Sequence, residues 1–266
     1  MNVSVNTGIY LFVLLVIVFS VQMVSGEKQE DTERIKVFEK VKEILREHDI
    51  YKAIEFVNSQ GEPQVVAKRY LDLAMDFYWK DKNLPEVINF AQAGIHYCLL
   101  KAQEYSRSNP DMAAQLKNTT KALSYNLASF TWPGWDEKGI VITNTDLITG
   151  LDAARLNLRL ALELEKGPAA VSVSHWVIGA QYLALGDYEK AIESFTAAQE
   201  KAREAEDKTS ELMNAGYIGI AKILAGKEKD GQKEFDNAQE GLTQQKTEDA
   251  DFYKEQLQTV LKVLSK

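Results

Sequence analysis

The sequence is poor in the residues that cross-link or interrupt a chain. Its 266 residues include one cysteine and only five prolines. The single cysteine, Cys98, excludes an intrachain disulfide, so the stability of the fold must come from packing. Because Cys98 stands in an apolar helical run, we interpret it as a small buried hydrophobic residue. The scarcity of proline leaves long segments uninterrupted, which favours helices over sheet.

Patterns of catalytic and metal-binding residues are absent as well. The three histidines, His48, His96 and His175, do not share metal-ligand spacing, and the sequence holds no HExxH motif, no GxSxG nucleophile elbow and no phosphate-binding loop. His96 and Cys98 are two positions apart, so a helix turns them to different sides. We therefore expect no catalytic residues, no metal and no cofactor. The net charge of −8 argues against nucleic acid as a partner.

Charged residues are missing from residues 1–26, which contain no Lys, Arg, Asp or Glu. Residues 9–24 form an almost unbroken apolar run that is short for a membrane span. We predict a secretory signal peptide over residues 1–26, a mature chain that begins at Glu27, and export to the periplasm or the outside of the cell. An uncleaved membrane anchor is the alternative, because the first eight residues carry no basic side chain.

What the sequence does contain is apolar periodicity of 3.6 residues throughout residues 27–266. This period predicts one all-α domain. The most regular stretch, residues 178–198, predicts two amphipathic helices and a tight turn. Gly179 allows another helix to approach closely, Gly186 ends the first helix, and Asp187 caps the second.

A repeat family has this pattern. Ile178-Gly179-x2-Tyr182 and Ala191-x3-Phe195 resemble the tetratricopeptide repeat (TPR), a helical hairpin of about 34 residues. A turn with an Asp or Asn recurs at Asp49 and at Asn83, and 83 − 49 = 34. The clearest copies cover residues 34–60 and 170–244. The resemblance to an exported TPR-like family implies an α-solenoid of about five helical hairpins plus a C-terminal capping helix near residues 247–264.

The resemblance also implies a function, that of a non-catalytic scaffold that binds a protein or peptide. In such solenoids the first helix of each pair lines the concave face. We therefore expect a groove that is acidic toward its N-terminal end and apolar toward its C-terminal end, with a basic and hydrophobic segment as the partner. Four of its residues share one side of a predicted helix over residues 64–80, and two come from later helices: Arg69, Asp72, Asp76, Trp79, Trp176 and Tyr217.

A second interpretation of the same residues stays open. The two aspartates can equally form a solvated helix face, and the next helix or a loop can cover the apolar positions.

Residues 131–145 are the least repeat-like stretch, a connection that is long for a helical hairpin. They contain Trp132 and Trp135, which we expect either to bind a partner or to pin the loop to the helices. The alternative function is an enzyme, or an accessory subunit of one, that uses residues 131–146 as its site. The following helix is predicted to begin with Asn144 or Thr145 as its cap.

Overall fold

The computed structural model describes the backbone of residues 24–265 and the side chains of residues 32–265. The predicted signal peptide or anchor, residues 1–26, lies outside the part of the chain whose side chains are described. None of the helices in the described part has a segment long and apolar enough to cross a membrane.

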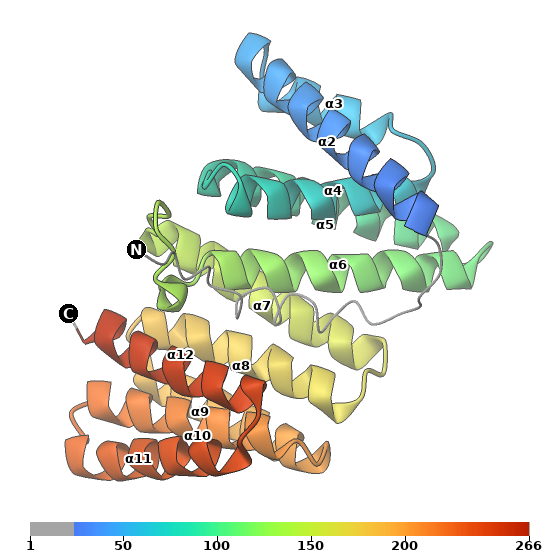
Figure 1. The fold of residues 1–266 in the computed structure, drawn as a ribbon. Coiled ribbons are helices and arrows are strands. Elements are labelled where there is room, and N and C mark those ends of the chain that lie inside the picture. The colour runs from blue at the N-terminus through green and yellow to red at the C-terminus, as the bar shows by residue number, and fades with distance from the viewer. Residues whose placement is uncertain (1–23, 266) are drawn as a thin grey trace.

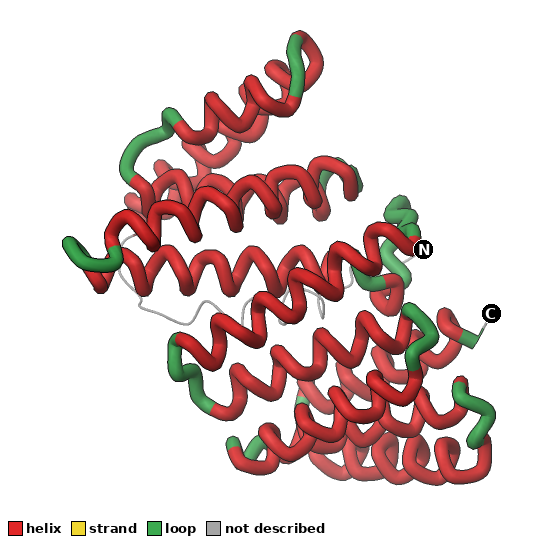
Figure 2. The backbone as a smooth tube through the Cα atoms, turned by 180° about the vertical axis from the view of Figure 1, so that it is seen from behind, coloured by secondary structure: helices red, strands yellow, loops and turns green. Residues whose placement is uncertain are grey.

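The described chain is all-helical, with short connections and no strand (Figures 1 and 2). It contains eleven α-helices and one 3₁₀ helix: α2 (Val24–Glu47), α3 (Ile50–Asn58), α4 (Pro63–Trp79), α5 (Leu84–Tyr105), α6 (Pro110–Phe130), η1 (Pro133–Trp135), α7 (Asn144–Glu163), α8 (Pro168–Ala184), α9 (Tyr188–Glu204), α10 (Lys208–Leu224), α11 (Glu228–Gln245) and α12 (Glu248–Leu264). The prediction of an all-α chain is confirmed.

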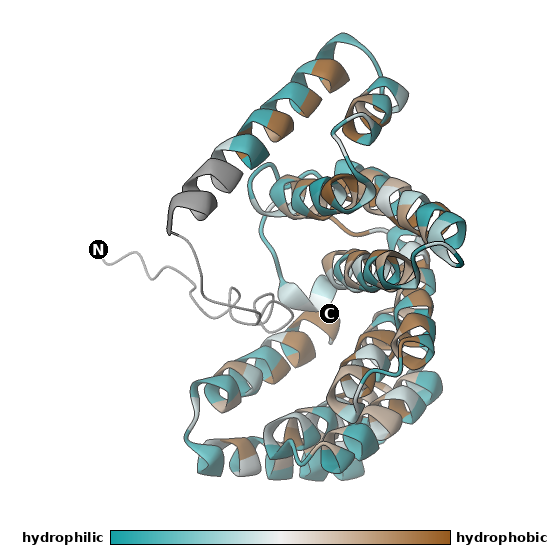
Figure 3. Ribbon diagram, turned by 90° about the vertical axis from the view of Figure 1, so that its right-hand side faces the viewer, coloured by the Kyte–Doolittle hydropathy of each residue, from teal (hydrophilic) through white to brown (hydrophobic). Residues whose placement is uncertain are grey.

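Neighbouring helices pack in pairs. The two helices of each of the pairs α2/α3, α4/α5, α6/α7, α8/α9 and α10/α11 pack against one another, and each pair also packs against the next. Figure 3 shows the pairs following one another along a curve, with α12 and the loop that contains η1 on its inner side. The loop thus enters the space that the curve encloses.

The hairpin of α8 and α9 forms where the sequence places it. Gly186 adopts a φ of 78°, which ends α8, and the Asp187 side chain accepts a hydrogen bond from the Lys190 N–H at the start of α9. A Cβ at Gly179 would lie 2.7 Å from the Phe195 ring, so the close approach at this glycine is also confirmed. Local signals of capping and helix termination therefore set this hairpin.

The start of α7 differs from its prediction. The N-cap is Thr143, not Asn144 or Thr145. The Asp146 N–H donates to Thr143 Oγ1 at 3.3 Å, while Thr143 donates its own N–H to Asp146 Oδ2 at 2.8 Å. This reciprocal capping box satisfies two backbone N–H donors at once, which neither Asn144 nor Thr145 does alone.

The core divides into two clusters, one within α2–α6 and one that extends from α4 to α12. Cys98 lies fully buried in the first cluster. Burial raises the pKa of the Cys98 thiol to about 12, so the thiol stays protonated at neutral pH. The interpretation of Cys98 as a small buried hydrophobic residue is confirmed.

Candidate functional site

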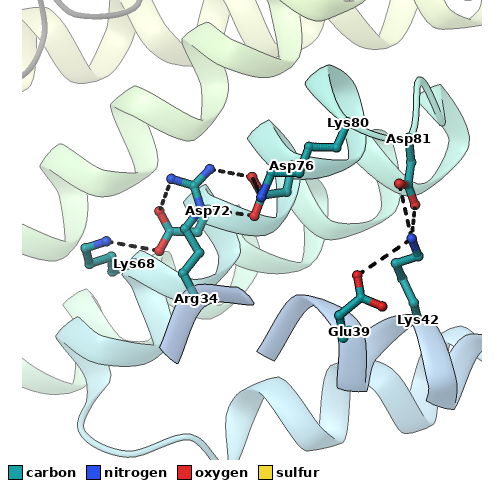
Figure 4. A network of polar contacts seen from close by, with 8 residues as sticks. All are labelled: Arg34, Glu39, Lys42, Lys68, Asp72, Asp76, Lys80 and Asp81. Atoms are coloured by element: carbon teal, nitrogen blue, oxygen red, sulfur yellow. Dashed lines mark hydrogen bonds and ion pairs between the residues drawn. The ribbon is translucent and has the colours of Figure 1, made fainter. Parts of the chain in front are cut away.

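Helix α2 covers the acidic side of α4. Asp72 and Asp76 are only 7% and 2% exposed. The Arg34 Nε of α2 donates to Asp76 Oδ2 at 3.0 Å, its Nη2 donates to Asp76 Oδ1, and its Nη1 lies 3.8 Å from Asp72 Oδ1. Lys68 and Lys80 each pair with one of the two carboxylates, at 3.0 and 3.1 Å (Figure 4).

Both expectations of exposure for these aspartates, as groove acids or as a solvated face, are therefore wrong. The physical reason is the bidentate arginine, which neutralises the carboxylates as α2 docks. Arg34 stands 42 residues before Asp76, so no helical spacing relates the two positions. Sequence reasoning missed Arg34 because an arginine on a charged amphipathic helix reads as a solvated residue.

Replacing Arg34 with alanine is expected to lower the free energy of unfolding by about 1–2 kcal/mol. Asp76 stays buried in the variant with Lys80 as its remaining partner, and the partial exposure of Arg34 keeps the loss below that of a fully buried pair. Denaturant unfolding measures the change. Arg159→Ala is the control, because Arg159 is exposed on α7. Equal losses in the two variants would contradict the role of Arg34.

The other two predicted residues of α4 lie apart from this network. Arg69 is mostly buried and places Nη2 3.2 Å from Glu33 Oε2 of α2. Trp79 is half-buried, and the Lys82 ammonium lies 5.1 Å from the centre of its ring. Lys82 Nζ also lies 2.7 Å from Glu137 Oε1, so Lys82 joins α4 to the loop of residues 131–143.

The tryptophans of that loop meet the predicted aromatic residues of the later helices. The ring of Trp132 lies 5.1 Å from that of Trp135 and 5.6 Å from that of Trp176, between ring centres. Tyr217 lies 6.1 Å from Trp132. Trp132, Trp176 and Tyr217 are at most 1% exposed, so they form no open groove surface. The interpretation that a loop covers the apolar positions and is pinned by its tryptophans is confirmed.

A cavity of about 170 Å³ lies where this loop meets α4 and α12. Its walls are aromatic and aliphatic, and two adjacent carboxylates belong to its lining: Tyr78, Trp132, Pro133, Asp136, Glu137, Ile140, Ile142 and Val263. Glu137 is partnered by Lys82, whereas Asp136 is exposed in the left-handed region with a φ of 49°. We call this cavity the loop pocket.

Polar residues near His175 have structural contacts. Ser172 donates to the Ala198 carbonyl at 2.7 Å, and Ser174 donates to Asn157 Oδ1 at 2.6 Å. Burial, with a smaller effect of Lys201, lowers the pKa of His175, so its imidazole is neutral at pH 7. Within residues 32–265, no three His, Cys, Asp or Glu side chains lie close enough together to hold a metal ion.

No protein-family model matches this sequence, and no curated protein matches it. Of the eight residues expected to bind a partner, the structure joins Trp132, Trp135, Trp176 and Tyr217 in one aromatic cluster, and it places the residues of α4 elsewhere.

Proposed function

We propose that this protein is a non-catalytic scaffold, a TPR-like α-solenoid that binds a peptide or protein segment and that is exported. Successive helical pairs along a curve support the solenoid, as does the recurrence of a capping Asp or Asn at Asp49, Asn83 and Asp187, each at the start of the second helix of a pair. The uncharged apolar stretch within residues 1–26 supports export.

The loop pocket is the observation that carries the binding proposal. Its apolar walls suit the methylene stem of a Lys or Arg side chain, and the exposed Asp136 suits the cationic head. A cavity of about 170 Å³ has room for one such side chain. The partner that fits is a segment with basic and hydrophobic residues, which agrees in sign with the net charge of −8.

Replacing Asp136 with alanine is expected to weaken the binding of a basic, leucine-containing peptide by about fivefold at low salt. The difference should shrink at high salt, because screening weakens an exposed ion pair. Fluorescence anisotropy with a labelled peptide measures both affinities. Asp152→Ala is the matched control, since it removes the same charge from an exposed position on α7. Equal affinities of the two variants at low salt would place the site elsewhere.

The alternative proposal is an enzyme, or an accessory subunit of one, that uses the same loop. The two adjacent carboxylates in the pocket lining favour it, because paired carboxyl groups can serve as acid and base. A panel of hydrolase substrates tests it with the same two variants. An activity lost in Asp136→Ala and kept in Asp152→Ala would establish the enzyme and overturn the scaffold.

A further inference from the structure

Helix α12 leaves the succession of stacked pairs. It packs on α11 and α10, and it also crosses the inner side of the curve to contact η1 (Figure 3). One side of α12 is buried by these contacts through Tyr253, Gln256, Leu257 and Val260, which are at most 7% exposed. Their spacing of three and four residues is that of an amphipathic helix lying in a groove.

The anchor of this helix is Leu257. A Cβ built at Gly216 of α10 would overlap Leu257 Cδ1, so the leucine occupies space that only glycine leaves open. Leu257 is fully buried there. α10 therefore presents a hole for one aliphatic side chain of a crossing helix.

The same contact buries polar groups without pairing them. Both side-chain polar atoms of Gln256 lack a hydrogen-bond partner among the described residues, and so does the Tyr125 hydroxyl of α6. Tyr125, Tyr217 and Tyr253 lie close enough to influence one another, and burial raises the pKa of each hydroxyl. The unpaired amide of Gln256 and hydroxyl of Tyr125 oppose the docking of α12, because water can hydrogen-bond to both groups once the helix leaves. Apolar contacts, together with hydrogen bonds between Gln239 of α11 and Gln258 and the Lys254 carbonyl, thus hold α12 against the penalty of these unpaired groups.

We propose that the surface formed by α10, α11 and η1 is a binding site for an amphipathic helix, and that α12 is its resident, displaceable occupant. The partner is a helix that presents an aromatic, an amide and two aliphatic side chains at the spacing of Tyr253, Gln256, Leu257 and Val260. This inference rests on the proposed scaffold function and names the class of its partner. Because Val263 of α12 lines the loop pocket, displacement of α12 also opens one wall of that pocket.

The probe is a fluorescein-labelled peptide of residues 247–265, added to the full chain and followed by anisotropy. In the wild-type protein, α12 competes with the peptide. The apparent affinity of the peptide is therefore its intrinsic affinity multiplied by the fraction of chains whose site is free. Leu257→Asp in the full chain undocks its own α12 and should bind the unaltered peptide about tenfold or more tightly than wild type does. A peptide that carries the same Leu257→Asp change is the control and should bind neither protein.

A second arm locks α12 in place. Gln258 Nε2 donates to Gln239 Oε1 of α11 at 3.3 Å on the exposed side of α12, so Gln239→Cys with Gln258→Cys can be joined by a short bismaleimide. Cys98 is the only other cysteine and is buried, so it escapes the reagent. The cross-linked protein should lose peptide binding about tenfold or more relative to the same variant before cross-linking. Peptide binding that is unchanged by the cross-link would overturn the inference.

The remaining outcomes of the peptide experiments also test this inference. A folded Leu257→Asp chain that binds the peptide no better than wild type overturns the inference, and circular dichroism reports whether the chain is folded. If that variant loses its helical signal, the cross-linked arm decides alone. A chain that binds the basic peptide through Asp136 but ignores the 247–265 peptide keeps the proposed function and loses this inference. If the chain binds neither peptide, the proposed function and this inference are both wrong.

Discussion

Replacing Trp132 with alanine is expected to lower the free energy of unfolding by about 4 kcal/mol. Trp132 is 1% exposed, and its ring packs edge-on against both Trp135 and Trp176. A Cβ at Gly134 would overlap the Trp132 ring, so the backbone of the loop lies directly on it. Truncation of the Trp132 side chain leaves a large cavity, which the close-packed neighbouring residues fill only in part.

Denaturant unfolding at constant pH measures this loss, and near-ultraviolet circular dichroism reports the aromatic cluster. Trp135→Ala is the matched control from the same loop. Trp135 is half-buried, and its Nε1 donates to the Ser129 carbonyl at 2.9 Å, so its removal should cost about half as much. If Trp132→Ala is no more destabilising than Trp135→Ala, the loop is not anchored by Trp132.

Replacing Gly219 with alanine is expected to lower the free energy of unfolding by about 3 kcal/mol. A Cβ at this position would lie 2.7 Å from the Phe235 backbone N and 2.8 Å from the Gly231 carbonyl oxygen. Both are main-chain atoms of α11, which cannot be moved aside by a change of side-chain rotamer. α10 and α11 must therefore move apart. The better helix propensity of alanine offsets only about 1 kcal/mol of the strain.

Gly167→Ala is the control for Gly219→Ala. Apart from its two chain neighbours, no residue places an atom within 4 Å of a Cβ at Gly167, and its φ of −58° suits any residue. The thermal midpoint of this variant should stay within the change expected for about 0.5 kcal/mol. A melting temperature of Gly219→Ala that matches the control would mean that α10 and α11 separate more easily than their contact indicates.

Most of the helices could be placed from the sequence alone. The predicted segments 64–80 and 247–264 match α4 and α12 to within one residue at each end. Apolar periodicity and caps act over three or four residues, so a short window of sequence contains the whole signal. The start of α7 was misplaced by one residue or two, because Thr143, Asn144 and Thr145 all have side chains that can cap. Only Thr143 stands three residues before Asp146, with which it forms the capping box.

The candidate site was less accessible from the sequence. Trp132 and Trp135 stood out because they lie in a long connection between helices. The contact of Trp132 with Trp176 and Tyr217 could not be predicted from the sequence, since it depends on how far the loop extends into the curve. The loop pocket also needs Val263, which comes from the last helix of the chain. No spacing rule relates residues that far apart.

The sequence by itself determined that this chain is helical, where most helices begin and end, and that glycine at 179 meets a close neighbour. Only the tertiary structure decided which polar and aromatic residues face water. Asp72 and Asp76 are buried because Arg34 of α2 pairs with them. α12 lies on the inner side of the curve, where Leu257 packs against Gly216. Helix formation depends on neighbours within one turn, whereas burial depends on the angles at which separate helices pack. Those angles follow from the whole set of side-chain contacts, which no local pattern contains.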